Sequence, residues 1–362
     1  MQPHRTSYKA QTQYELNKPP QDGITSLNFA PENSQYLLAT SWDTSVSLYD
    51  IYKNERIQYY KHESPVLTAC FIEHQHYCVS AGTDGNIVMK NIKTGQKSNL
   101  CLIGEHAAPV RTSCYNSAHS LLFTGSWDTK INVYDPKISN FDDTNLVKTL
   151  SNHGKIFAMD LISNDKLAVA TSNQDIYIWD LRYLVTPCQK RKSTLANQIR
   201  DICAFPKGAA SSSGSSSELK EGFVSCSTEG RASVEFLDPI SSKLVDKFAF
   251  KCHRNKDENG IETIHPVNSI SFSKKYQTFA TAGSDGFVNI WDPFAKKRIY
   301  QLPKYPVGVV NVSFGNDVSK PSVIAVACSY NYELEVDPIE VPSDRIYIRN
   351  LEEGDIMRNV KS

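Results

Sequence analysis

The chain repeats one pattern of hydrophobic and polar positions. A short apolar run leads into a turn of small and acidic residues, and an alternating strand follows and ends at another polar residue. The clearest copy is residues 279–293, where the turn Gly283-Ser284-Asp285-Gly286 separates two such runs. The pattern indicates strand, turn and strand. A single hairpin of this kind cannot bury both of its faces, so it must stack on copies of itself.

The copies recur along the whole chain. Five other turns carry the pattern, and they begin at Ser41, Gly82, Ser126, Ser172 and Ser227. A seventh, degenerate copy runs through residues 324–328 and resumes at 345–349. The closing positions Asp50, Asn91, Asp135 and Asp180 lie 41, 44 and 45 residues apart, which is typical of WD-type blades of four strands. We therefore predict an all-β fold, a seven-bladed WD40 β-propeller.

The propeller is expected to be one domain that spans residues 13–350, between an N-terminal tail (1–12) and a C-terminal tail (351–362). The strand character of residues 13–17 predicts that this segment completes the last blade by pairing with residues 346–349, which closes the ring and removes its exposed edges. Residues 207–221 are rich in serine and predict a flexible loop in blade five. The inner strands have long apolar runs, which argues against a polar site on the axis.

Composition excludes several classes of function. Lys plus Arg and Asp plus Glu are balanced at 39 each, so no overall field attracts nucleic acid or a membrane surface. The nine cysteines form no Cys-x-x-Cys pair, which favours reduced thiols in the core and no metal site. Catalytic and cofactor fingerprints are not found, so we expect neither an enzyme nor a bound cofactor. The N-terminus lacks the apolar core of a signal peptide, and the protein is expected to be intracellular.

Three histidines precede inner strands, His62, His106 and His153. Metal binding or acid–base chemistry is one interpretation. A structural role is favoured, in which each imidazole bonds to the turn aspartate of its blade and ties the strands together. The expected partners are Asp84, Asp128 and Asp175.

Two tryptophans occupy an unusual place. Trp42 and Trp127 lie within turns, where the usual residue is small, so both are expected on one rim of the ring. Exposed indoles are favoured where partners bind, although local packing explains them equally well.

Cations are predicted to gather on the same rim over blades five and six. Arg200 begins the inner strand of blade five, Arg231 follows that blade's second turn, and Lys251 precedes His253 and Arg254 at the start of the next blade. Such a cluster suits a phosphate or a pair of carboxylates. The alternative is that each cation pairs with a nearby acid, for example Arg231 with Glu229.

Several segments carry a family resemblance. They are Ser-Trp-Asp-Thr-Ser-Val (41–46), Glu-Gly-Arg-Ala-Ser-Val-Glu-Phe (229–236), Phe-Lys-Cys-His-Arg (250–254), Pro-Val-Asn-Ser-Ile (266–270) and residues 281–298. They closely resemble the Bub-three family of mitotic checkpoint WD-repeat proteins, over roughly residues 13–350. The serine-rich loop and the acidic excursion at 332–344 depart from the family pattern.

The resemblance implies a non-enzymatic adaptor of the spindle assembly checkpoint, in the nucleus, at kinetochores and also in the cytoplasm. Its implied partners are the checkpoint kinase and its inhibitor relative, bound through a short glutamate-containing motif, an outer-kinetochore scaffold with phosphorylated Met-Glu-Leu-Thr repeats, and the assembly that inhibits the anaphase-promoting complex. The implied phosphothreonine-binding residues are Arg231 and Lys251. The implied partner-motif residues are Arg200, Trp42 and Trp127, with His253 and Arg254 as additional rim contacts.

Two other functions stay open from the sequence. The chain also resembles the nuclear mRNA-export WD-repeat factor, which shares the Cys-His-Arg segment (252–254), although residues 292–298 look more like the checkpoint family. That factor binds a similar motif in a nucleoporin and would bind single-stranded RNA with a steep salt dependence. A propeller hydrolase is the third class, and it would need a polar or metal-binding site on the axis.

Overall fold

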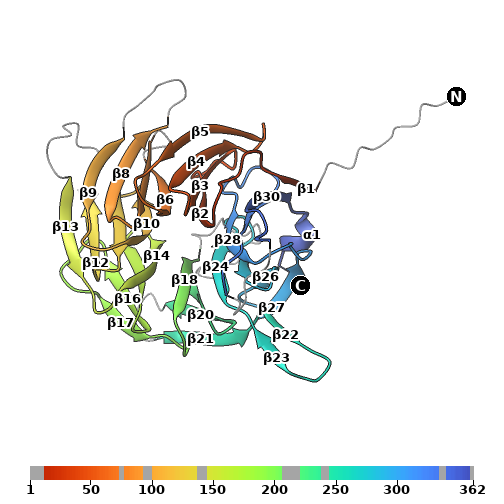
Figure 1. Cartoon of the computed structure of the whole chain (residues 1–362). Helices are drawn as coiled ribbons and strands as arrows, with labels where there is room; N and C mark the ends of the chain where they lie inside the picture. Colours follow the sequence, from red (N-terminus) through yellow and green to blue (C-terminus); the bar gives the residue numbers. More distant parts are fainter. Residues whose placement is uncertain are drawn as a thin grey trace.

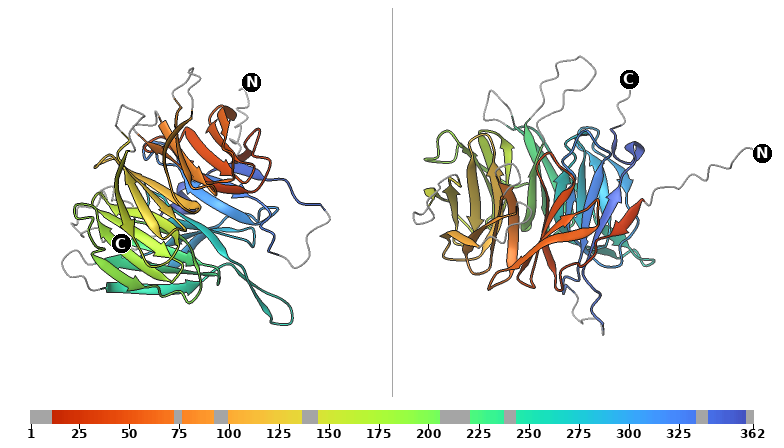
Figure 2. Two further views of the ribbon diagram at one scale, coloured as in Figure 1. Left: turned by 60° about the vertical axis from the view of Figure 1, so that its left-hand side comes forward. Right: turned by 90° about the horizontal axis from the view of Figure 1, so that it is seen from above.

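The computed structural model describes residues 12–72, 77–92, 100–136, 145–205, 221–237, 244–333 and 340–358. These residues form seven four-stranded antiparallel sheets around a central axis, which confirms the predicted seven-bladed propeller (Figure 1). The two further views show the sheets standing side by side around the ring (Figure 2). The predicted serine-rich loop at 207–221 lies almost entirely outside the described residues.

The first four blades follow the chain without interruption. Blade one is β2 (Ile24–Phe29), β3 (Tyr36–Ser41), β4 (Ser45–Asp50) and β5 (Glu55–Lys61). Blade two is β6 (Val66–Ile72), β7 (Tyr77–Gly82), β8 (Asn86–Asn91) and β9 (Cys101–Glu105). Blade three is β10 (Val110–Asn116), β11 (Leu121–Ser126), β12 (Lys130–Tyr134) and β13 (Leu146–Ser151). Blade four is β14 (Ile156–Ser163), β15 (Lys166–Thr171), β16 (Asp175–Asp180) and β17 (Gln189–Lys192).

The later blades carry the insertions. Blade five is β18 (Ile199–Ala204), β19 (Gly222–Ser227), β20 (Arg231–Leu237) and β21 (Leu244–Lys251). A separate hairpin, β22 (Arg254–Lys256) and β23 (Glu262–Ile264), extends away from the ring before blade six (Figure 1). Blade six is β24 (Val267–Phe272), β25 (Phe279–Gly283), β26 (Val288–Asp292) and β27 (Lys297–Gln301). Blade seven is β28 (Val309–Phe314), β29 (Val323–Cys328), β30 (Arg345–Asn350) and β1 (Gln13–Glu15).

The ring closes as the sequence predicts. Strand β1 pairs antiparallel with β30, and Gln13, Tyr14 and Glu15 lie opposite Arg349, Ile348 and Tyr347. The first strand therefore completes the last blade, which leaves no open end in the ring.

The C-terminal segment does more than the predicted tail. After β30 the chain forms one helical turn, α1 (Glu353–Ile356), against blade six. The Ile356 side chain is fully buried, and its backbone carbonyl accepts a hydrogen bond from the Thr278 hydroxyl at 3.1 Å. The described part of this segment, up to residue 358, is therefore attached to the propeller. No helix in the described residues is long and apolar enough to cross a membrane.

The cores lie between neighbouring blades. One cluster joins Phe123 and Ile131 of blade three to Val169 and Trp179 of blade four. Trp179 is 2 % exposed, and its indole N–H donates to the Asn152 side chain at 3.2 Å. This confirms the alternating third strand as a packing element, because each sheet buries one apolar face against the next sheet.

The inner strand of every blade contains a β-bulge at its second residue. The pairing register shifts around one residue in each of β2, β6, β10, β14, β18, β24 and β28. The bulged residues are Thr25, Leu67, Arg111, Phe157, Arg200, Asn268 and Val310. A bulge leaves its residue unpaired and redirects the side chain. The fold thus produces a ring of seven redirected side chains at one end of the axis.

The bulges lie at the rim that carries the predicted turns. In each blade the residue after the second strand donates its backbone N–H to the residue before the inner strand, as from Trp42 to Gly23 and from Trp127 to Pro109, both at 2.9 Å. These bonds hold the turn and the incoming connection together, as the sequence analysis expects. We call this end of the ring the upper rim.

Candidate functional site

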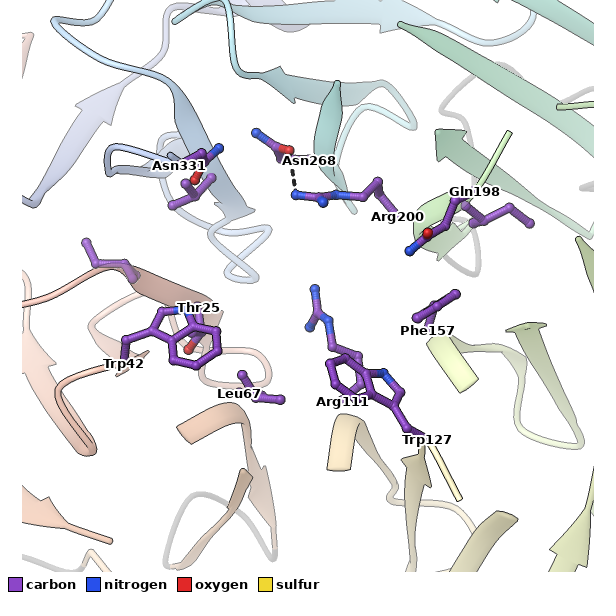
Figure 3. A pocket seen from close by; sticks show the side chains of 13 residues that line it. Thr25, Trp42, Leu67, Arg111, Trp127, Phe157, Gln198, Arg200, Asn268 and Asn331 are labelled. Atoms are coloured by element: carbon purple, nitrogen blue, oxygen red, sulfur yellow. Dashed lines mark hydrogen bonds between the residues drawn. The ribbon is translucent and has the colours of Figure 1, made fainter. Parts of the chain in front are cut away.

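The upper rim is hollowed at its centre. A cavity of about 240 Å³ opens there, and all seven bulged residues line it together with Trp42 and Trp127 (Figure 3). We call this cavity the axial mouth. Every one of the seven blades contributes a side chain to the axial mouth, so no single repeat could form it.

Arg200 enters the axial mouth in a fixed position. Its guanidinium donates to the side-chain oxygen of Asn268 at 2.9 Å, the bond drawn in Figure 3. The amide group of Asn268 in turn donates to the Ser284 hydroxyl and to the Val309 carbonyl, at 2.9 and 2.8 Å. Because the amide nitrogen is occupied, the oxygen must face Arg200. The structure therefore places Arg200 on the predicted rim and orients it from blade six.

Arg111 is the cation that sequence reasoning missed. It occupies the same bulge position in blade three that Arg200 occupies in blade five, and its side chain reaches into the middle of the axial mouth (Figure 3). Burial lowers the pKa of its guanidinium, which Asp201 opposes, and the charge of Arg200 lowers it further. The equivalence of the second positions in the inner strands was the signal that could have identified it.

The two rim tryptophans differ in their surroundings. Trp42 is 49 % exposed, so it offers a broad apolar face to solvent. Trp127 is partly buried, with Phe157 edge-on at 6.5 Å between ring centroids and the Lys155 ammonium 5.8 Å from its ring. The indole N–H of Trp127 is buried and has no hydrogen-bond partner among the described residues. The structure puts both tryptophans at the axial mouth, and Trp127 also packs locally.

Arg231 and Lys251 face each other at the edge of blade five. They are directly opposite in the antiparallel pairing of β20 and β21. Directly opposed side chains lie on one face, with Cβ atoms about 5 Å apart, and like charges there repel. We call these two residues the blade-five pair. The arrangement costs stability unless an anion lies between them.

Nearby acids neutralise the blade-five pair only weakly. Lys251 is 4.0 Å from the Glu262 carboxylate on the β23 strand. Glu229 instead accepts hydrogen bonds from the Ala196 backbone and the Asn197 side chain, at 3.0 and 3.1 Å. Arg231 has no ion pair in the described parts of the chain, so the pairing with Glu229 that the sequence left open is not found.

Arg254 stabilises the turn that immediately precedes Arg231. Its guanidinium donates to the backbone carbonyls of Glu229 and Gly230, at 2.8 and 3.4 Å, and to Glu262 at 2.9 Å. Each of its three guanidinium nitrogens makes one of these bonds, so Arg254 links the turn to the hairpin beside Lys251.

His253 lies inside blade six, which corrects its expected place on the rim. Its side chain is fully buried, and its ring bonds to Asp285 at 2.8 Å and to the Thr281 hydroxyl at 2.9 Å. The Trp291 N–H donates to the same hydroxyl at 2.9 Å. This residue therefore performs the strand-tying role that the sequence assigned to other histidines.

Among those other histidines only one makes the expected pair in the described chain. His106 bonds to Asp128 and to Thr124, both at 2.9 Å. Burial lowers the pKa of His106, although the Asp128 carboxylate opposes this. His62 bonds instead to the Ser80 hydroxyl at 2.8 Å.

His153 is exposed, and Asp175 pairs instead with Lys190 at 3.2 Å and Lys192 at 3.3 Å. The sequence explains this difference, because Asp175 is the fourth residue of its turn motif whereas Asp128 is the third. Asp175 therefore already belongs to strand β16.

The axis below the mouth is polar, which corrects the expectation of an apolar axis. A second cavity, of about 180 Å³, shares Leu67, Arg111 and Asn268 with the mouth. Most of its other lining residues carry hydroxyl or amide groups, including Ser26, Thr68, Thr112, Ser269, Ser271 and Ser313, and Leu27, Ile270 and Val312 also line it. Asp201 also lines it, and burial raises the pKa of its carboxyl to about 6. Its oxygens accept the backbone N–H groups of Ile202 and Ile270, both at 2.9 Å, which ties blade five to blade six. In the described residues no three metal-binding side chains come together.

Comparison with known proteins places the chain among WD-repeat proteins of the mitotic checkpoint. The family described as WD domain, G-beta repeat, matches residues 11–50, 97–135, 144–180 and 260–292. The chain is 36% identical to mitotic checkpoint protein bub-3 of Caenorhabditis elegans, over 96% of each chain. It is also 36% identical to mitotic checkpoint protein BUB3.1 of Arabidopsis thaliana, over 94% of each. Identity to the mRNA export factor GLE2 of Chaetomium thermophilum is 29%, over 88% of this chain and 84% of the relative.

Proposed function

The chain belongs to the Bub3 family of mitotic checkpoint WD-repeat proteins, and on that basis we propose that it is a phosphothreonine-dependent adaptor of the kinetochore. It would bind a glutamate-containing motif of the checkpoint kinase and of that kinase's inhibitor relative over the upper rim. It would recruit both to an outer-kinetochore scaffold by reading phosphorylated Met-Glu-Leu-Thr repeats, and so act in the nucleus and at kinetochores. A role in the assembly that inhibits the anaphase-promoting complex belongs to the same proposal.

The observation that carries the proposal is the blade-five pair. Two cations face each other across β20 and β21, and the nearest acid, Glu262, is 4.0 Å from Lys251. A phosphothreonine supplies close to two negative charges and three acceptor oxygens. Charge-assisted hydrogen bonds of this kind contribute about 1.5–3 kcal/mol each. A dianion between the two side chains would replace repulsion with two such bonds.

The second binding surface is the axial mouth. Trp42 presents an exposed indole, and Arg200 is oriented by Asn268. Aromatic and arginine side chains are the residue types that dominate binding energy at interfaces. A peptide that crosses the rim could therefore contact both tryptophans and place an acidic side chain near Arg200.

The test is binding of one Met-Glu-Leu-Thr peptide, phosphorylated and unphosphorylated, to the protein that carries its glutamate-motif segment. We expect the phosphorylated peptide to bind at least about 100-fold more tightly, because two charge-assisted contacts depend on the phosphate. Equal affinity for the two peptides would refute the phosphate-reading function.

The same experiment addresses the RNA-export alternative. That reading is supported by the identity of 29% to an mRNA export factor. It requires binding to single-stranded RNA that weakens steeply with salt. RNA binding together with loss of phosphopeptide discrimination would favour export over the checkpoint.

A further inference from the structure

The hairpin β22–β23 is an insertion in the repeated pattern of the blades. Four residues (62–65) connect blade one to blade two, and four (106–109) connect blade two to blade three, whereas fifteen (252–266) connect blade five to blade six. The hairpin extends away from the ring, so closure of the ring does not require it (Figure 1). What the hairpin adds must therefore lie in its own side chains.

The base of the hairpin is firmly attached to the propeller. The His265 backbone N–H donates to the His253 carbonyl at 3.0 Å, and the His253 side chain is fully buried. Glu262 in β23 is two residues from the cross-strand partner of Arg254 in β22. Cross-strand partners share a face of the hairpin, and so do residues two apart in a strand, which puts Arg254 and Glu262 on one face.

On this face Glu262 contacts two cations at once. Its Oε2 accepts a hydrogen bond from the Arg254 guanidinium at 2.9 Å and lies 4.0 Å from the Lys251 ammonium. The Arg254 side chain is 12 % exposed and that of Lys251 is 59 % exposed, so the contact with Arg254 is both shorter and better shielded from solvent. Arg254 therefore fixes the carboxylate, and Lys251 is only loosely attached to it.

Glu262 thus supplies a negative charge beside the blade-five pair. Among the described residues it is the one acid within 4.0 Å of either Arg231 or Lys251. These two cations lie directly opposite each other and repel, and a carboxylate beside them partly offsets the repulsion. An ion pair at 4.0 Å with a mostly exposed lysine is weak, so a better anion displaces it easily.

We propose that Glu262 is an internal competitor for the phosphate site. Its carboxylate partly neutralises the blade-five pair while the site is empty, and an arriving phosphate draws Lys251 away from it. Glu262 itself stays bonded to Arg254 throughout. This inference rests on the proposed function, since it describes how the same phosphothreonine site is regulated.

The competition makes phosphate binding readily reversible. A phosphothreonine carries close to two negative charges, so the fixed Glu262 carboxylate repels it about twice as strongly as it repels a single carboxylate. The phosphate still binds, because its oxygens can meet Arg231 and Lys251 together. The site therefore accepts a dianion but holds it less tightly than the two cations alone would allow, which leaves the bound peptide free to dissociate.

The test is the variant Glu262→Gln in the full chain that carries its glutamate-motif segment. This change removes the charge and keeps an oxygen that accepts a bond from Arg254. We expect the phosphorylated Met-Glu-Leu-Thr peptide to bind about 3- to 10-fold more tightly than it binds the wild type, and the unphosphorylated peptide to change by less than about twofold. Isothermal titration measures both affinities.

Glu258→Gln is the matched control. Glu258 lies in the exposed turn of the same hairpin, between the ends of β22 and β23, so its substitution removes an equal charge away from Lys251. The control should leave the phosphopeptide affinity within about 1.5-fold of the wild type. Equal tightening in both variants would overturn the proposal, because only the overall charge would then matter. Unchanged or weaker binding by Glu262→Gln would overturn it too, since Glu262 would then merely position its neighbours.

A double-mutant cycle tests whether Lys251 is the shared partner. Lys251→Met keeps Arg231 as a phosphate contact, so binding stays measurable at higher peptide concentration. In this background Glu262→Gln should tighten the phosphopeptide by no more than about twofold, because there is no lysine left to release. An undiminished gain would show that Glu262 does not compete for Lys251.

Failure of this inference is distinguishable from failure of the proposed function. If the wild type does not prefer the phosphorylated peptide, the proposed function itself fails. If the wild type prefers it and Glu262→Gln binds no more tightly, only the role of Glu262 is refuted. Circular dichroism of each variant confirms that the propeller is folded.

Discussion

The axial mouth and the blade-five pair are both built from two cations on one rim, but they are constructed in different ways. In the mouth, Arg111 and Arg200 come from blades three and five and are brought together by bulges in separate strands. In the pair, Arg231 and Lys251 are cross-strand neighbours within one blade. Arg111 and Arg200 line a cavity that opens at the rim, whereas the Lys251 side chain is 59 % exposed on the edge of its blade.

This difference determines what each region can select. A cation in a cavity meets only a ligand group that fits into that cavity, so it selects by shape and length. An exposed pair interacts through a screened field and favours the ligand with the larger charge. We infer that the mouth is suited to a carboxylate side chain and the pair to a phosphate.

The largest effect is expected from a charge reversal in the blade-five pair, which should weaken one ligand and leave the other almost unchanged. Arg231→Glu should weaken phosphopeptide binding more than about 100-fold, because it removes one charge-assisted contact and adds repulsion. The glutamate-motif segment should bind this variant within about twofold of the wild type. Isothermal titration of both ligands checks this, and circular dichroism confirms that the blade is intact. Unchanged phosphopeptide affinity in a folded variant would remove Arg231 from the site.

A smaller effect is expected from salt. Raising the salt concentration from 0.05 to 0.5 M, about a tenfold change, should weaken the phosphopeptide by about 10-fold and the partner segment by about threefold, because screening acts most on exposed charges. The measurement is a titration series at constant pH. If the affinities of the two ligands fell equally with salt concentration, the axial mouth and the blade-five pair would be equally open to solvent, and the proposed difference between them would be wrong.

The smallest effect is expected from pH. The phosphate loses its second charge near pH 6, so phosphopeptide affinity should fall about threefold between pH 7.5 and 5.5. The partner's glutamate, with a pKa near 4.3, stays ionised over this range. Fluorescence anisotropy of labelled peptides measures both. An equal loss for both ligands would point to a change in the protein and not in the phosphate.

An equal loss of affinity for both ligands would also follow if the protein itself became less stable at low pH, so its stability must be controlled. Burial lowers the pKa of His62 and of His106. The unfolded chain, with histidine pKa values near 6.5, therefore takes up protons more readily than the folded chain as the pH falls. The stability contributed by these neutral histidines is present above about pH 6.5 and is lost below it, so the titrations belong well below the melting temperature.

Repetition made the fold predictable from the sequence. Seven copies of one hairpin pattern specify seven blades, and the strand character of residues 13–17 predicts the closure by β1. The C-terminal turn was not predicted, because its attachment depends on one buried side chain, Ile356, and on a carbonyl that meets Thr278. Contacts between distant segments leave no periodic signal in the sequence.

The site was only partly predictable. The positions of Trp42 and Trp127 follow from the turns that carry them, and those of Arg200 and Lys251 follow from the strand ends on the same rim. Arg111 was missed because its equivalence to Arg200, as the second residue of an inner strand, becomes meaningful only once the bulges are known. His253 was misplaced because the β22–β23 hairpin separates it from its partner Asp285 by 32 residues, compared with 22 residues between His106 and Asp128.

The closure of the ring also determines how the molecule can bear mechanical load. The first described strand and the last one run antiparallel, and Gln13 lies opposite Arg349. A force applied to the two chain ends would therefore break the hydrogen bonds of this pairing one after another, and would not load all of them at the same time. Tension that passes through partners bound on the upper rim spreads over several blades instead. A protein of this shape resists force best when it is held by its partners and not by its ends.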